Sequence, residues 1–388
     1  MTHQSRIMAI FFVQSIAMGS WFPRIPEVQA KLGLGPAELA LALLGMPIGL
    51  LMTLPFAGGF VARVGARTTI IGGFALFLLL APLPSLAWNL PSLFFALLIV
   101  GTAISGLELG LNVAADAIEH AGGRKIMSTC HGFWSLGQMV GSLVGVGFAA
   151  IAAPVSLSLA TVSLLLVGPA LWLGYTLPPL PGSGPVPTHA AHERRSRPSK
   201  ALIGLCLFVL GIAMTEGAAA DWSAVFLRDV IGAPLATAGF GYTAYAFAIA
   251  AGRFLGDTLS TRFGPVVLAR FCGAVTILGV GIVITSTGPV QAMIGLAALG
   301  FGCSVGFPLG VTAAARLGDR SAARNVALLS LFALFGFLLG PPMIGFVAEH
   351  LDLRYGLAML LPALALSFVL AGGLRPRRPA GELAGSSA

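Results

Sequence analysis

The chain has 388 residues, of which 57% are hydrophobic and only 9% are charged, and its mean hydropathy is +0.93. Soluble domains carry about 25% charged residues, so this composition excludes a water-soluble globular protein. The net charge of +8 does not indicate nucleic-acid binding, because the basic residues lie mainly between apolar runs, where they suit contact with anionic lipid.

Apolar runs of about twenty residues recur along the whole chain, and each is long enough to cross roughly 30 Å of hydrocarbon as a helix. The runs lack strict alternation, which favours helices over a β-barrel. We therefore predict an all-α membrane protein with twelve transmembrane helices, at about residues 7–28, 36–57, 68–87, 91–118, 126–150, 154–176, 201–226, 235–256, 265–286, 290–316, 324–348 and 354–374. The first run contains Pro23, Arg24 and Glu27 and lacks an Ala-x-Ala site, so we do not interpret it as a cleavable signal.

One segment rich in proline, glycine and basic residues, 178–200, interrupts the apolar pattern and is typical of an extended linker. It divides the chain into an N-terminal six-helix half (1–177), a cytoplasmic linker (178–200), a C-terminal six-helix half (201–375) and a disordered cytoplasmic tail (376–388).

The basic residues predict the orientation. Twelve spans place both termini on one side, and all but four of the 22 Lys and Arg residues fall on that side; the four are Arg24, Lys31, Arg228 and Arg354. By the positive-inside rule, both termini lie in the cytoplasm. We expect a multi-pass protein of the bacterial inner membrane.

The two halves resemble each other at a constant offset of 200 residues. The residues Gly106, Leu109, Gly110, Ala114, Ala115, Arg124 and Gly145 recur as Gly306, Leu309, Gly310, Ala314, Ala315, Arg324 and Gly345. Such a parallel repeat of six helices is expected of a secondary transporter.

Two loop motifs carry a family resemblance: GGFVARVGAR at 58–67 and GRFLGDTLSTRFGP at 252–265. With them the chain resembles the major facilitator superfamily over residues 6–375. Four further motifs resemble its rhizopine-transport-type branch and, distantly, fucose-permease-like sugar/proton symporters. They are SWFPRIPEV, the E-x-x-x-N of span four, HGFWSLG at 131–137 and EGAAADWS at 216–223. This resemblance implies pseudo-symmetric halves, alternating access, and a central cavity lined by spans one, four, seven and ten. The chain departs from the pattern at Ala62, where the loop motif usually has an acid, and it lacks an acid in the buried part of span one.

Carboxylates deep in the apolar spans are the main candidates for function. Glu108, Asn112 and Asp116 share one helix face, and Glu108 lies roughly 15 Å from the inner end of its span. A charge at that depth costs at least about 2.5 kcal/mol, so we expect it to face water or a partner. We predict proton coupling by Glu108, Glu216 and His131; the alternative is that they are structural groups held by hydrogen bonds.

Span five places Trp134 and Gln138 on the face of His131, where an indole N–H and an amide suit sugar or polyol hydroxyls. The full set of predicted substrate contacts is Asn112, Trp134, Gln138, Gln14, Tyr242, Tyr245 and Asn325. We interpret Trp21 as an interfacial anchor.

We also predict gating residues and close helix contacts. The gating residues are Asp116, Arg63, Arg67, Asp257, Arg262 and Pro308. Pro308 aligns with Glu108 across the repeat and removes one backbone hydrogen bond, which permits a bend. In span eleven the residues expected to allow close helix packing and bending are Gly336, Gly340, Pro341, Pro342 and Gly345.

These features predict a secondary active transporter of a small polar solute of the sugar, polyol or aminocyclitol class, coupled to protons. The chain has no G-x-x-x-x-G-K-[ST] motif, which excludes ATP-driven transport by this chain alone. We expect no enzymatic activity, no cofactor and no metal site, and a monomer whose partners are the solute, protons and membrane lipids. An exporter of drugs or metabolites by proton antiport, a lipid transporter and a non-transporting membrane receptor remain as alternatives.

Overall fold

The computed structural model describes residues 1–123, 126–178 and 197–375. Arg124 of the sequence repeat, most of the predicted linker and the predicted tail 376–388 lie outside these residues. Every regular element in the described ranges is a helix. All twelve predicted spans are present, and eleven of them are long and apolar enough to cross a membrane. The predicted fold class is therefore confirmed.

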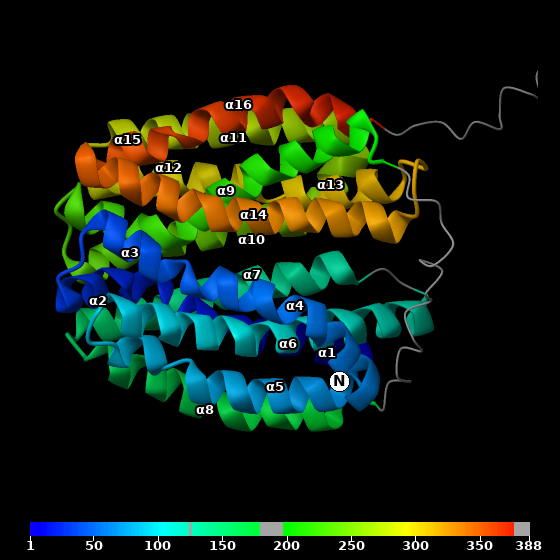
Figure 1. Cartoon of the computed structure of the whole chain (residues 1–388), viewed down its shortest axis with the longest axis horizontal. Helices are drawn as coiled ribbons and strands as arrows, with labels where there is room; N and C mark the ends of the chain where they lie inside the picture. Colours follow the sequence, from blue (N-terminus) through cyan, green and yellow to red (C-terminus); the bar gives the residue numbers. More distant parts are fainter. Residues whose placement is uncertain (124–125, 179–196, 376–388) are drawn as a thin grey trace, which may run out of the picture.

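The helices form two groups (Figure 1). The first group contains α1 (His3–Gly19), η1 (Phe22–Arg24), α2 (Ile25–Leu32), α3 (Pro36–Leu43), α4 (Gly45–Val64), α5 (Ala66–Leu80), η2 (Leu83–Leu86), α6 (Leu90–Gly122), α7 (Met127–Ala150) and α8 (Val155–Thr176). The second group contains α9 (Lys200–Asp229), α10 (Leu235–Phe263), α11 (Pro265–Thr285), α12 (Pro289–Cys303), α13 (Gly306–Ala315), α14 (Ala322–His350), α15 (Leu353–Ala358), α16 (Leu360–Leu370) and η4 (Ala371–Leu374).

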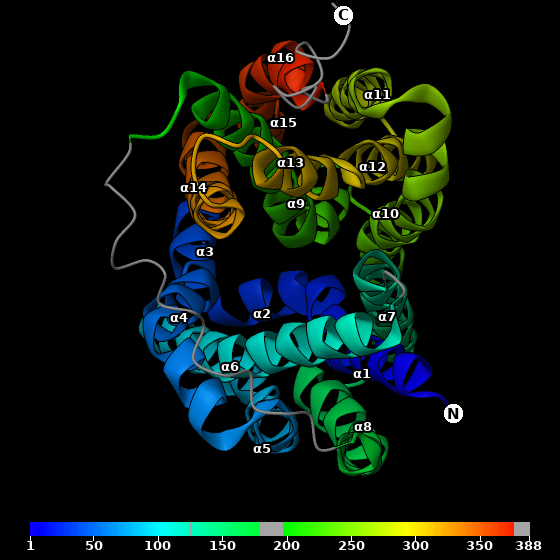
Figure 2. The same ribbon diagram turned by 90° about the vertical axis from the view of Figure 1, so that its right-hand side faces the viewer.

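Helices α4 and α10 each run seven residues beyond the predicted spans. They end at Gly65 and Gly264, whose φ angles of 84° and 80° are strained for any residue with a Cβ. The extra turns carry Arg63 and Arg262, which the apolar pattern could not include. We call this end of the bundle, where residues 1 and 375 of the described chain also lie, the terminal end, and the opposite end the distal end (Figure 2).

The remaining span, α10, is not marked by hydropathy. Its uncharged part, residues 235–252, contains several Gly, Thr and Tyr residues, and Arg253, Asp257 and Arg262 follow. The tenth span is broken at Ser304 and Val305 into α12 and α13. Pro308 lacks the N–H that would bond the Ser304 carbonyl, which accounts for the interruption of the helix one turn before it.

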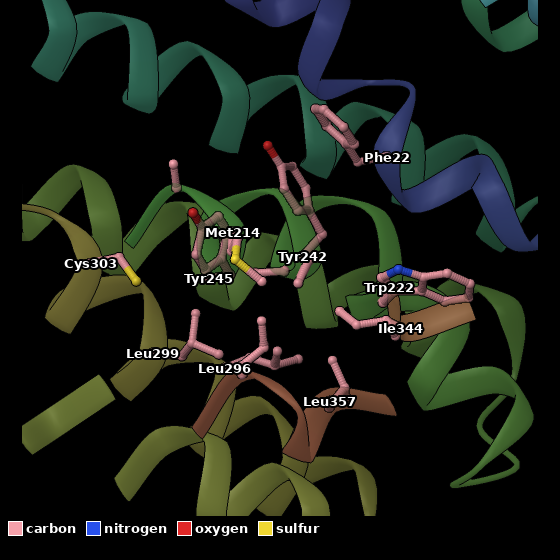
Figure 3. Packing of buried hydrophobic residues seen from close by; sticks show 14 of the residues in the cluster. Phe22, Met214, Trp222, Tyr242, Tyr245, Leu296, Leu299, Cys303, Ile344 and Leu357 are labelled. Atoms are coloured by element: carbon pink, nitrogen blue, oxygen red, sulfur yellow. The ribbon is translucent and has the colours of Figure 1, made fainter. Parts of the chain in front are cut away.

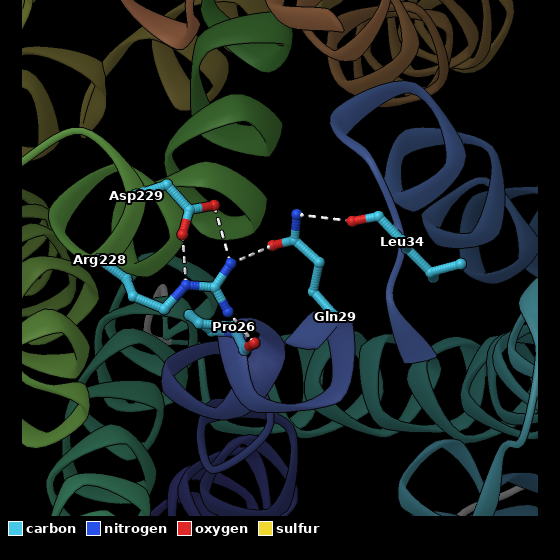
Figure 4. Close-up of polar contacts among 5 residues, drawn as sticks. All are labelled: Pro26, Gln29, Leu34, Arg228 and Asp229. Atoms are coloured by element: carbon cyan, nitrogen blue, oxygen red, sulfur yellow. Dashed lines mark hydrogen bonds and ion pairs between the residues drawn. The ribbon is translucent and has the colours of Figure 1, made fainter. Parts of the chain in front are cut away.

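Contacts between the two groups close the distal end. Arg228 of α9 donates to the Pro26 carbonyl and to Gln29 Oε1, the latter at 2.9 Å, and pairs with its neighbour Asp229 (Figure 4). Gln29 is itself fixed by a 3.1 Å bond from Nε2 to the Leu34 carbonyl. We call Arg228, Asp229, Pro26 and Gln29 the distal latch.

Close packing between α14 and α3 adds to this closure. A Cβ on Gly345 would lie 2.4 Å from the Ala40 Cβ, and Glu349 accepts a 3.1 Å bond from the Ala37 N–H. Gly336 and Gly340 approach α9 in the same way, since a Cβ on either would lie within 3 Å of its backbone. The predicted close contacts of span eleven are confirmed.

A buried apolar cluster crosses from the second group into the first. Phe22 of η1 packs on Tyr242 of α10 with ring centroids 4.6 Å apart, in the same cluster as Met214, Leu296 and Leu299 (Figure 3). Trp21 belongs to the same cluster and is only 6% exposed. The interpretation of Trp21 as an interfacial anchor was therefore wrong, because η1 turns it into the protein.

At the terminal end the groups separate between α6 and α13 (Figure 2). The Asp116 side chain on α6 is 64% exposed, and Pro308 and Thr312 on α13 are exposed as well. The groups remain in contact there through α7 and α10, where the rings of Phe133 and Phe254 meet edge to face. The structure is thus closed at the distal end and parted at the terminal end.

Candidate functional site

A chain of polar contacts joins the two groups near the middle of their helices. It begins on α1 with Gln14, whose Oε1 accepts a 2.9 Å hydrogen bond from the Trp134 indole on α7. The Trp134 ring lies 5.7 Å from the guanidinium carbon of Arg253 on α10, within cation–π range. Arg253 in turn pairs with Glu216 on α9 at 3.6 Å. Four helices from both groups therefore converge on one site.

Arg253 is the residue that sequence reasoning missed. The positive-inside count assigned it to the side of the termini, yet α10 continues ten residues beyond it to Phe263, roughly 15 Å of helix. Its side chain is only 12% exposed. A signal was present, because Arg253 falls inside the predicted span 235–256, and an ionisable residue inside a span is by default a functional candidate.

Two further hydrogen bonds join α7 and α10 on the distal side of this chain. The Tyr242 hydroxyl donates to Gln138 Oε1 at 2.7 Å, and the hydroxyls of Ser142 and Thr243 lie 2.7 Å apart. Tyr245 stacks beside Tyr242 with ring centroids 5.8 Å apart. The predicted contacts Gln138, Tyr242 and Tyr245 are therefore neighbours, although all three are already buried against each other in this structure.

Two buried polar atoms of the site have no partner within hydrogen-bond distance among the described residues: Glu216 Oε1, and Gln14 Nε2, which neighbours the Glu108 carboxylate. One is a donor and the other an acceptor. Leaving a buried polar group unpaired costs about 1–3 kcal/mol, and each such group in a folded protein requires an explanation. A ligand with both hydrogen-bonding senses would satisfy them.

Glu108 and Asn112 lie on α6, which runs along the side of the first group that faces the second (Figure 2). Both side chains are half-buried, and Glu108 neighbours Gln14. Asn112 Nδ2 donates to the Glu108 backbone carbonyl at 2.8 Å, so this amide is partly occupied within its own helix. Asp116, further along α6, lies 3.3 Å from His120 Nδ1, on its own helix.

His131 lies on the side of α7 toward the terminal end. Its ring meets Phe11 edge to face at 5.5 Å, and its backbone carbonyl accepts a 3.1 Å bond from Ser135. It is also close enough to Arg253 to interact electrostatically. His131 therefore borders the site without bonding to either glutamate.

Asn325 lies away from the site, although we predicted it as a substrate contact. It is fully buried at the terminal end, where Nδ2 donates to the Ala314 carbonyl at 3.1 Å and to Asp319 at 2.8 Å. Burial alone would raise the pKa of Asp319, but hydrogen bonds from Ser199 and Asn325 outweigh it and hold that pKa below its usual value. Asn325 thus fastens the loop between α13 and α14.

The loop residues predicted as gates make no ion pair with one another in the part of the chain that is described. Arg67 donates to the Tyr175 carbonyl within the first group at 2.6 Å, and Arg262 stacks over Phe263. Arg63 and Asp257 are exposed. This is the arrangement expected when the terminal ends are apart.

Comparisons with known proteins agree with the fold. The profile of the Major Facilitator Superfamily matches residues 7–288 and, separately, 201–387. An uncharacterised MFS-type transporter of Yersinia pestis is 33% identical over 365 residues, which cover 92% of each chain.

Two solved structures are similar in fold. A mutant of the nucleoside transporter NupG superposes with a TM-score of 0.75 at 14% identity, covering 96% of this chain and 100% of that one. A mutant of the E. coli fucose:proton symporter FucP gives a TM-score of 0.62 at 16% identity, covering 96% and 98%. The resemblance to a transporter superfamily, predicted from the loop motifs, is confirmed.

Proposed function

The chain belongs to the Major Facilitator Superfamily, and we propose that it is a secondary active transporter that moves a small polar solute between its two helix groups by alternating access. The observation that carries the proposal is the chain of polar contacts from Gln14 through Trp134 and Arg253 to Glu216. It lies near the middle of the helices, where ionisable residues are rare in membrane proteins and usually mark a functional site.

The unpaired atoms support a hydroxyl-rich solute of the sugar, polyol or aminocyclitol class. A hydroxyl can donate to Glu216 Oε1 and another can accept from Gln14 Nε2, while the Trp134 ring offers an apolar face. NupG and FucP are named for a nucleoside and for fucose, both hydroxyl-bearing solutes. At their low identity they share only the fold, so the solute class rests on the side chains of this chain.

Protons are the proposed driving ion. Glu108 and Glu216 border the site at mid-depth. For Glu108, a neutral carboxylic acid is far easier to carry through a closed, dry state than a carboxylate, whereas the charge of Glu216 is already balanced by Arg253. By the positive-inside rule the terminal end faces the cytoplasm, so protons would load from the distal side of the inner membrane and leave through the terminal end. A proton shifts the balance between the two states only by its different affinity for them.

A solute screen on the purified full-length protein tests this proposal. Sugars, polyols, aminocyclitols and lipophilic cations are added at about pH 5.5 and about pH 7.5, and thermal unfolding is followed. A solute at a hundred times its Kd should stabilise the protein by about 2.7 kcal/mol. The stabilisation should depend on pH in the wild type and in Asp116→Asn, and should depend less steeply on pH in Glu108→Gln, where Glu216 still titrates. Asp116 is the matched control because it is on the same helix face yet exposed and paired with His120.

Three outcomes would contradict parts of the proposal. A solute whose stabilisation ignores both pH and Glu108→Gln would remove proton coupling. Binding of lipophilic cations without binding of polyols would contradict the solute class and favour an exporter. Binding without flux in proteoliposomes would contradict transport itself and favour a receptor.

A further inference from the structure

The guanidinium of Arg253 is held by both helix groups at once. Its Nη1 donates to Ser135 Oγ of the first group at 2.6 Å, and its carbon lies over the Trp134 ring of the same helix. Its Nη2 pairs with Glu216 of the second group. The Arg253 and Glu216 side chains are only 12% and 13% exposed, so water competes little for these contacts.

The pairing with Glu216 is incomplete. The distance of 3.6 Å is longer than the 2.7–2.9 Å typical of charge-assisted hydrogen bonds, and the second carboxylate oxygen, Oε1, is buried without a partner. The carboxylate is therefore held mainly by the charge of Arg253 rather than by a full set of hydrogen bonds. Such a contact depends strongly on whether Glu216 carries its negative charge.

The other titratable groups around this pair come from each neighbouring helix. They are His131 on α7, Asp221 on α9, Tyr242 and Tyr245 on α10, and Cys303 on α12. Arg253 keeps its proton at any pH of interest because guanidinium pKa values exceed 12. Changes of charge in the pair must therefore come from the carboxylate.

We infer that Arg253 is a positioning residue that ties the charge on Glu216 to the contact between α7 and α10. The inference rests on the proposed transport cycle. With Glu216 ionised, Arg253 is fixed between its own group and Ser135, which stabilises the arrangement that is parted at the terminal end. When one proton binds a Glu216 oxygen, Arg253 loses its counter-charge and must change its contacts, and the balance shifts away from this arrangement.

Spin-label distances on the purified full-length protein test the inference. Ala62→Cys on α4 and Ala323→Cys on α14 place labels on exposed sites at the terminal ends of the two groups. In the wild-type background the ratio of parted to closed populations should change by about tenfold or more between pH 5 and pH 8, within the usual range of coupling between sites. Glu216→Gln and Arg253→Gln should each reduce that change to less than about twofold, and the double variant should behave like either single one.

Arg253→Lys separates positioning from packing. Lysine keeps the charge but not the fork that reaches Ser135 and Glu216 together, so it should restore part of the pH response. A purely structural arginine predicts instead that all Arg253 variants melt earlier while keeping the full pH response, which would overturn the inference. So would a wild type whose populations do not respond to pH. Proteoliposome flux that persists without a pH response would leave the proposed transport standing while this inference fails.

Discussion

Replacing Arg228 by glutamine should open the distal end of the protein. Arg228 is the arginine of the distal latch: from α9 it donates to the Pro26 carbonyl and to Gln29, both on the other helix group. Its ion pair with Asp229 stays within its own group and does not hold the groups together. The substitution removes the charged donor and leaves the local helix unchanged.

The size of the effect follows from the two hydrogen bonds that cross between the groups. A hydrogen bond to a charged group contributes about 1.5–3 kcal/mol when buried, and the Arg228 side chain is 19% exposed, so the lower end applies. Glutamine can keep one weaker bond. We therefore expect the distal-closed arrangement to lose roughly 2 kcal/mol relative to the distal-open one, about a thirtyfold change in their ratio.

Distance measurements between spin labels at the distal end provide the assay. The labels are attached at Trp88→Cys in the first group and Leu351→Cys in the second. The native residues at these positions are 78% and 67% exposed, whereas the four native cysteines are buried. The control is Arg354→Gln. Arg354 is also a distal arginine, but it donates to the Ile284 carbonyl within the second group.

The expected result is a larger population of long distances in Arg228→Gln and a wild-type distribution in Arg354→Gln. Equal distributions in all three proteins would show that the distal latch does not hold the groups together. A shift of the same size in both variants would show that loss of any distal arginine loosens this end, which would also refute the reasoning.

Three further predictions concern stability and binding. The lowered pKa of Asp319 implies stability that is fully present above its unfolded pKa of about 4 and is lost as pH falls through the folded pKa. Thermal unfolding should therefore show Asp319→Asn less stable than the wild type by roughly 1 kcal/mol at pH 7, and this difference should close toward pH 2.5. A difference in stability that does not depend on pH would contradict this prediction. On α7, Gly141→Ala should destabilise the protein by about 1–3 kcal/mol because the new Cβ would lie 2.1 Å from the Ile16 carbonyl oxygen. Gly147→Ala is the control and should not destabilise it, since a Cβ there would meet only open space. Equal melting temperatures of the two variants would refute the packing argument. Trp134→Phe removes the donor to Gln14 and should weaken binding of the transported solute by up to about tenfold, measured by calorimetry, and an unchanged Kd would remove Trp134 from the proposed site.

The sequence by itself determined the helices and their depth. In hydrocarbon every backbone polar group must be paired within its own segment, so an apolar run of the right length has little alternative to a helix. The same reasoning located Glu108 and Glu216 near mid-span and predicted the bend near Pro308. These properties depend only on residues close together in the chain.

The tertiary structure decided which side chains meet. The sequence pattern counted Arg253 on the side of the termini and predicted Asn325 as a substrate contact, whereas the fold pairs Arg253 with Glu216 and turns Asn325 toward Asp319. It also turned Trp21 inward and closed the distal end through Arg228. The contacts of Arg253 with Glu216 and of Arg228 with Pro26 join residues far apart in the chain. They follow from the packing of whole helices, because helix rotation and register are set by all the neighbouring helices together and not by the local pattern.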